Sequence, residues 1–281
     1  MPETRKPKNE EAYIGKRGEE ILIDILKNRR DVVECIEKLT WRSIGNVVEV
    51  IRGDCFNLWK TDVVLIGSTG ERVGISLKTF RAGGRPDVHL DRRWLDKPSE
   101  KARPWSEVLE MPEDILKILR EGILRKAEKK SRPLVQDSSD QQKVGKFLSK
   151  VIRKFLWEAF RNDERDLLIL ALLEYNNELK LCLFNLDEVI DFIEKDVQKK
   201  GIAFGSRIDI GNFIQWQRKA GNGKRVKIPK TDPRHPGNQL QVKLLARYLT
   251  DAAIKQISGC CFNLAESRIK PTHKSLENYL K

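Results

Sequence analysis

The chain has 281 residues, enough for one large domain or two small ones with a substantial core. Its 54 Lys and Arg residues outnumber 41 Asp and Glu residues, and the net charge of +13 indicates a polyanionic partner. No apolar run approaches the roughly 18 residues that a membrane-spanning helix needs, and no signal peptide opens the chain, so we expect no membrane partner and a cytoplasmic protein.

The cysteines are odd in number and show no C-x-x-C spacing. They are Cys35, Cys55, Cys182, Cys260 and Cys261. Buried, reduced cytosolic thiols are the expected state, and the three His residues lie away from any Cys pair, which disfavours a zinc site.

The first predicted helix covers residues 11–28, whose apolar residues fall on one stripe. Gly18 lies on that stripe and would let the helix approach a sheet closely. Two β-prone pieces follow, at 32–36 and 47–51. They predict a strand or a helix, and then a loop that leads to the next segment.

The most informative stretch is 58–80, where two apolar runs flank the turn-forming sequence Gly-Ser-Thr-Gly-Glu. This pattern predicts a β-hairpin. Asp62 begins its first strand, and on the second strand the alternation places Ser76 and Lys78 on the same face. We therefore expect a carboxylate and an ammonium group to meet across the strand pair.

This arrangement resembles the PD-(D/E)xK nuclease superfamily, and within it the type II restriction endonucleases. In that family an Asp begins one core strand, a D/E-x-K tripeptide lies on the next, and the carboxylates hold a divalent metal. The resemblance implies that Asp62 binds Mg²⁺ and that Lys78 positions the attacking water. Ser76 takes the place of the second acid, which departs from the family pattern and leaves open which acid substitutes for it.

The resemblance extends to Gly15-Lys-Arg-Gly-Glu19, which looks like the G-x-x-x-E near the start of many PD-(D/E)xK domains. It implies that Glu19 binds the metal, directly or through water, and helps to offset the acid missing at Ser76. A solvated helix acid is the alternative for Glu19. Glu34 and Glu49 are further acids in the same part of the sequence.

A basic, glycine-rich segment at 81–94 follows the hairpin. Arg binds phosphate in a bidentate manner and Gly permits close approach, so we expect this loop to contact a phosphate backbone, with an ordinary exposed loop as the alternative. Its predicted DNA-binding residues are Arg81, Arg85, Arg92 and Arg93. Pro86 and Asp87 match the letters PD, but we expect no strand after them.

Apolar residues at helical spacing predict helices at 112–130 and 140–161. The segments 167–173 and 179–184 are almost entirely apolar and predict a hairpin at the centre of a sheet. A short helix from residue 185 to about 197 is expected next.

The second informative stretch is 208–245, with predicted strands at 213–219 and 239–245. Gln, Arg and Lys on adjoining strands can make bidentate contacts to base edges. The stretch also resembles the C-terminal Q-R-K … L-Q-F-K strands of several type II restriction enzymes. The predicted DNA-binding residues here are Gln217, Arg218, Lys219, Lys224, Arg225, Arg234, Gln239, Gln241 and Lys243.

A rival catalytic site lies in the same stretch, with Asp232 followed by the tripeptide Gln-Val-Lys that ends at Lys243. We disfavour it because no strand precedes Asp232 to fix its position. A helix at 247–257 and a mixed tail at 260–281 complete the chain.

The predicted fold is α/β, a restriction-endonuclease-like central mixed β-sheet flanked by helices. Its strands are expected from 47–80, 166–184 and 206–245. We expect a single domain over residues 1–281, with a catalytic core at about 11–185 and DNA-recognition strands and loops at about 206–245.

The resemblance implies a sequence-specific endonuclease that hydrolyses double-stranded DNA with Mg²⁺ and works as a homodimer. A cation is needed because the scissile phosphate repels hydroxide until its charge is neutralised. One alternative is a non-catalytic DNA-binding protein with a degenerate site, in which Asp62 and Lys78 form a structural ion pair. A structure-specific nuclease of repair or recombination is the other.

Overall fold

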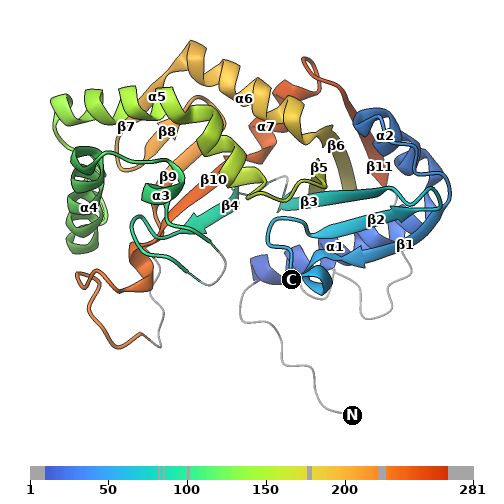
Figure 1. Cartoon of the computed structure of the whole chain (residues 1–281), viewed down its shortest axis with the longest axis horizontal. Helices are drawn as coiled ribbons and strands as arrows, with labels where there is room; N and C mark the ends of the chain where they lie inside the picture. The colour runs from blue at the N-terminus through green and yellow to red at the C-terminus, as the bar shows by residue number, and fades with distance from the viewer. Residues whose placement is uncertain are drawn as a thin grey trace.

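A computed structural model describes the chain over residues 10–81, 83–84, 86–99, 102–175, 179–220 and 226–264, without the side chains of 10–13. In this range the chain forms two β-sheets with helices packed around and between them (Figure 1). Among these residues, no helix is both long and apolar enough to cross a lipid bilayer.

The larger sheet is mixed and has the strand order β1-β2-β3-β5-β6-β11. Its strands are β1 (Val47–Arg52), β2 (Val63–Gly67), β3 (Arg72–Arg81), β5 (Leu167–Tyr175), β6 (Leu179–Asn185) and β11 (Gly259–Leu264). β3 and β5 are parallel, and the other neighbours are antiparallel. Both predicted hairpins are confirmed, and β5 lies inside the sheet, as its continuous apolar sequence predicts.

The second sheet is antiparallel, with the order β4-β10-β9-β8-β7. Its strands are β4 (Asp87–Arg93), β7 (Ile202–Phe204), β8 (Ile208–Ile210), β9 (Ile214–Arg218) and β10 (Leu240–Leu245). Two predictions are corrected here. The strands of 206–245 do not join the central sheet, and the expected loop at 81–94 contains strand β4. β4 was not predicted because its inward-facing residues include the charged Asp91 and Arg93, so the strand lacks a continuous apolar face.

Two hydrophobic cores lie on the two faces of the larger sheet. The smaller core lies under α1 (Glu10–Asn28) and α2 (Arg30–Thr40). The larger core joins both sheets to the remaining helices, α3 (Trp105–Val108), α4 (Glu113–Glu128), α5 (Ser138–Phe160), α6 (Leu186–Lys200) and α7 (Ala246–Ala253). In Figure 1, α5 and α6 run side by side above the two sheets. The helices predicted at 11–28, 112–130, 140–161, 185–197 and 247–257 are confirmed, with shifted ends.

Alternation along β3 and β5 keeps the two cores apart. Ile75 and Leu77 of β3 belong to the smaller core, and Phe80 belongs to the larger one. Gly18 of α1 packs against β3, where an added Cβ would lie 2.5 Å from Thr79 Cγ2. The close approach predicted from Gly18 is therefore confirmed, and it brings α1 to the strands that carry the candidate site.

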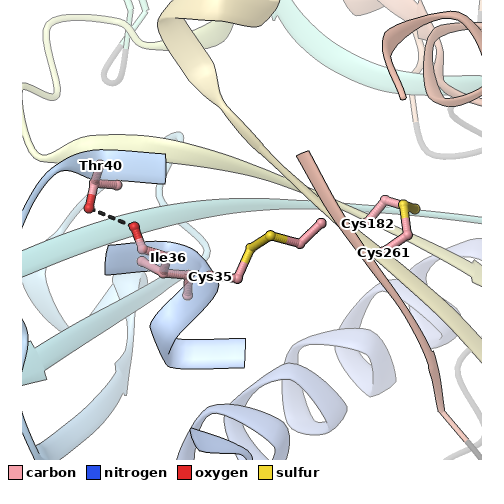
Figure 2. Close-up of a disulfide and its surroundings, with 6 residues drawn as sticks. Cys35, Ile36, Thr40, Cys182 and Cys261 are labelled. Atoms are coloured by element: carbon pink, nitrogen blue, oxygen red, sulfur yellow. Dashed lines mark hydrogen bonds between the residues drawn. A yellow bond between two sulfur atoms is a disulfide. The ribbon is translucent and has the colours of Figure 1, made fainter. Parts of the chain in front are cut away.

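The prediction of buried, reduced thiols is wrong, because four of the five cysteines form disulfides and the fifth, Cys55, is exposed. Cys35 bonds to Cys260, and Cys182 bonds to Cys261 (Figure 2). Successive residues of a strand point to opposite faces, so β11 reaches α2 through one cysteine and β6 through the next. These disulfides could not be predicted, because the sequence of β11 was interpreted as part of a mixed tail and not as a strand that pairs with β6. Cys55 is free and exposed.

Candidate active site

Three predicted residues meet at the open end of the β2–β3 hairpin, where Asp62 directly precedes β2 and hydrogen-bonds to Ser76 of β3. Asp62 Oδ2 accepts hydrogen bonds from Leu77 N at 2.6 Å and from Ser76 Oγ at 3.3 Å. Lys78 Nζ lies 3.3 Å from the same oxygen and donates to Ser76 Oγ at 2.9 Å. The serine hydroxyl therefore contacts both charged groups and holds them in one arrangement.

The trio is open to solvent on its charged side only. Ser76 is 3% exposed, whereas the side chains of Asp62 and Lys78 are 28% and 15% exposed. A hydroxyl carries no negative charge, so Ser76 cannot replace the carboxylate that the family pattern has at its position. Its hydroxyl instead helps to orient the side chains of Asp62 and Lys78.

Glu19 approaches this site from α1. It makes no hydrogen bond to Asp62 in the described structure, and its nearest ionic partner is Arg52, at 3.9 Å. Burial raises the pKa of Glu19, and the negative charge of Asp62 raises it further. The two carboxylates therefore repel each other. Asp54, which sequence reasoning missed, also raises this pKa. It lies exposed in the short helix η1 (Gly53–Phe56), and no sequence signal marks it.

These residues fit a hard divalent cation in their chemistry. Mg²⁺ prefers carboxylate oxygens and keeps several waters, so it needs only one or two protein acids. Asp62 Oδ1 accepts no hydrogen bond from the described residues, and a cation between Asp62 and Glu19 would relieve their repulsion. In the described ranges, no three His, Cys, Asp or Glu side chains gather closely enough to hold a metal by themselves.

The other acids considered from the sequence are less well placed. Glu34 is exposed on α2, where it pairs with Arg30. Glu49 is exposed on β1. No contact joins either of them to Asp62 across the described ranges.

A buried charge network lies behind the site. Lys60 Nζ donates to Asp91 Oδ2 at 2.6 Å, to Leu90 O at 3.1 Å and to Ala159 O at 2.8 Å. Burial lowers the pKa of Lys60 to about 8, although the charge of Asp91 acts in the opposite direction. The network ties the segment before Asp62 to β4 and α5. Sequence reasoning missed Lys60, because a single Lys beside a strand gives no sign of burial.

The same network corrects one predicted DNA contact. Arg93 is 1% exposed and donates to Asp91 Oδ2 at 2.7 Å and to Glu158 Oε2 at 3.3 Å. Its guanidinium group also lies 4.5 Å from the ring centre of Trp105. Arg93 is therefore part of the interior and presents no surface to DNA.

Polar side chains gather on one face of the second sheet. The register aligns Arg92, Gln241 and Gln217 in one row, and His89, Lys243 and Gln215 in the next. Residues that alternate with them, such as Val242 and Trp216, belong to the larger core. We call these six residues the polar face of the second sheet. Four of the six are predicted DNA-binding residues. Gln215 is the one buried member of this face.

The polar face lies within electrostatic reach of the Asp62–Lys78 site. Desolvation by the surrounding protein lowers the pKa of the His89 imidazole to about 4, and the positive charge of Arg92 lowers it further. The charge of Lys78 acts in the same direction. Within the face, Lys243 forms an ion pair with Asp87, the first residue of β4.

The remaining predicted DNA-binding residues fall into three groups. Arg218 is 4% exposed and donates to Asn238 Oδ1 at 2.8 Å, so the prediction that it contacts DNA is corrected for the same reason as that for Arg93. Arg85, Lys224 and Arg225 lie outside the described residues. Four further residues are partly or fully exposed and stay predictions, namely Arg81, Lys219, Arg234 and Gln239.

The rival catalytic pair is not brought together. Asp232 accepts hydrogen bonds from the guanidinium group and backbone N–H of Arg234, which lower its pKa to about 2. The ion pair of Lys243 is with Asp87 instead. Pro86 and Asp87, set aside from the sequence, do lead into a strand, so Asp87 and Lys243 form a second acid–lysine pair on the second sheet.

Comparison with known proteins identifies the fold. No protein-family model matches the chain, and no curated protein matches its sequence. The crystal structure of restriction endonuclease MspI in complex with its cognate DNA is similar, with a TM-score of 0.54 and 14% identity over 86% of this chain and 93% of that one. The chain therefore has a restriction-endonuclease-like α/β fold, a central mixed sheet flanked by helices, as predicted.

Proposed function

We propose that this protein is a Mg²⁺-dependent endonuclease that cleaves double-stranded DNA at specific sequences, as type II restriction enzymes do. The observation that carries the proposal is the meeting of Asp62, Ser76 and Lys78 at the end of one hairpin. The similar fold of a restriction endonuclease solved with DNA supports it. The homodimer implied by the sequence resemblance stays a prediction.

Each polar group has a role in hydrolysis of a phosphodiester. Asp62 and Glu19 would hold Mg²⁺, which neutralises the phosphate and makes its bound water more acidic. Lys78 lies beside Asp62 and can orient the attacking water while its charge stabilises the extra negative charge of the transition state. Ser76 keeps the Lys78 ammonium group in place.

Recognition is assigned to the polar face of the second sheet. Gln and Arg side chains make bidentate hydrogen bonds to adenine and guanine edges, and Arg92, Gln241 and Gln217 form one continuous row. The net charge of +13 supplies the sequence-independent attraction to phosphates. On this proposal, binding and cutting lie on neighbouring sheets of one chain.

A non-catalytic DNA-binding protein is the second candidate. The observation that favours it is the absence of an acid at Ser76, together with the 3.3 Å contact between Lys78 and Asp62, which can be a purely structural ion pair. On this account the polar face binds DNA, and the residues at the end of the hairpin do not cleave it.

Plasmid and phage DNA incubated with the protein and Mg²⁺ separates the two candidates. Discrete fragments support the endonuclease, whereas retarded but intact DNA supports the binding protein. Cleavage confined to branched DNA indicates a structure-specific nuclease. Asp62→Ala and Lys78→Ala should each slow cleavage by at least ~10²-fold while duplex binding in Ca²⁺ persists. Lys199→Ala, an exposed lysine on α6, serves as the control. Cutting at the wild-type rate by either site variant excludes this site.

A further inference from the structure

The segment 59–61, immediately before Asp62, is held by one distant carboxylate. Glu164 Oε1 accepts from Trp59 N at 2.6 Å and from Lys60 N at 2.7 Å. Its other oxygen accepts from Thr61 N at 2.8 Å and from Thr61 Oγ1 at 2.7 Å. Glu164 lies in the connection between α5 and β5, more than a hundred residues later in the chain.

This arrangement orders a stretch that has no strand to support it. Residues 59–61 belong to no helix or strand, so their N–H groups have no ladder partners. Three successive N–H groups that converge on one anion form strong, charge-assisted hydrogen bonds. The backbone entering Asp62 is therefore fixed in direction by Glu164.

The backbone of Asp62 itself is fixed from two further sides. Its N–H donates to Ile75 O at 2.9 Å, and its carbonyl accepts from Gly53 N at 2.9 Å. An added Cβ at Gly53 would lie 1.8 Å from Thr61 O, so the close contact requires glycine. Together with these anchors, Glu164 fixes the backbone that carries Asp62.

We propose that Glu164 is a positioning residue for the metal site, acting through segment 59–61 on Asp62. This inference rests on the proposed function. Glu164 touches neither Lys78 nor Asp62 side chains in the described structure, so it acts on the chemistry only through the backbone it holds.

The test compares Glu164→Gln and Glu164→Ala with Asp163→Asn. The amide of Gln must turn its NH₂ group toward some of the N–H donors, and Ala removes all four hydrogen bonds. Asp163 is the neighbouring carboxylate, exposed and paired only with Arg103 among the described residues, so its variant controls for lost charge.

Three measurements are needed on the full chain. The first is metal affinity by calorimetry with Mn²⁺ and with Ca²⁺, in the absence and presence of a duplex. The second is single-turnover cleavage as a function of Mg²⁺ concentration, and the third is amide hydrogen exchange at residues 59–62. Groups that orient metal ligands typically contribute 10–100-fold to metal affinity or activity. We expect both Glu164 variants to lose roughly 10–100-fold in metal affinity and in cleavage rate, and their amides at 59–62 to exchange faster. Their affinity for the duplex in Ca²⁺ should be unchanged. Asp163→Asn should behave as the wild type in all three measurements.

A purely structural role gives a different result. It lowers the melting temperature but leaves metal affinity and the rate per folded molecule unchanged, and that outcome overturns the proposal. If Glu164→Ala does not fold, Thr61→Val, which removes one of the four hydrogen bonds, should still shift metal affinity in the same direction. Wild-type metal affinity in both Thr61→Val and Glu164→Gln also overturns it. If the wild type neither binds metal nor cuts DNA, the proposed function fails, and the exchange data still show whether Glu164 orders residues 59–62.

Discussion

Lys60 Nζ lies 2.6 Å from the carboxylate of Asp91, in a part of the protein where the two side chains are 5% and 0% exposed. This ion pair joins the segment that leads into Asp62 with strand β4 of the second sheet. A second contact, from Lys60 to Ala159 O, adds α5 to the same junction. The candidate catalytic and recognition elements are thus joined by buried charges as well as by apolar packing.

Asp91→Asn should destabilise the protein strongly. The substitution leaves Lys60 and Arg93 buried beside a neutral group, and breaking a buried ion pair from one side costs about 3–5 kcal/mol. Urea denaturation measures the loss. Asp191→Asn is the matched control, because Asp191 pairs with Arg153 on the surface and should cost less than about 1 kcal/mol. Equal losses in the two variants would contradict this account of the network.

Ser76→Ala should slow cleavage by roughly 10-fold, since it removes the hydroxyl that holds Asp62 and Lys78. Ser76→Thr retains the hydroxyl and is the control. Ser76→Asp supplies the acid that the family pattern has at this position, so we expect half-maximal cleavage at a lower Mg²⁺ concentration. Single-turnover rates across a Mg²⁺ series test both. An unchanged Mg²⁺ requirement in Ser76→Asp means that another acid already fills this role.

Gln241→Ala should reduce sequence discrimination. Gln241 lies between Arg92 and Gln217 on the polar face, and loss of a bidentate base contact costs on the order of 1–3 kcal/mol on the cognate duplex and little on random DNA. Salt titrations of both duplexes should show the same slope as wild type, because no phosphate contact is removed. A loss of equal size on the two duplexes would assign Gln241 to non-specific binding.

Lys243→Ala should weaken or relax recognition but leave metal-dependent cutting. Lys243 is paired with Asp87 on the polar face, away from the Asp62 hairpin in the chain. Binding and cleavage are measured separately, with Ca²⁺ and Mg²⁺. If chemistry disappears while sequence-specific binding is undiminished, the active site lies at the Asp87–Lys243 pair, and Asp87→Ala should then behave in the same way.

The hairpin at 58–80 and the meeting of Asp62 with Ser76 and Lys78 could be predicted from the sequence. Both depend on local rules, namely turn composition and two-residue alternation, that need no distant partner. The same holds for the long helices and for the close packing of Gly18. The buried β5–β6 hairpin was readable because continuous apolar strands are buried on both faces.

Which charges are buried, and which distant strands pair, depends on the folded chain as a whole. Arg93 and Arg218 look like DNA contacts in the sequence, yet they are interior residues, because Glu158 and Asn238 reach them from other positions in the fold. Glu164 gave no local signal, since its partners lie 103–105 residues away. Such groupings arise from pairing between distant segments, and no pattern within one segment encodes them.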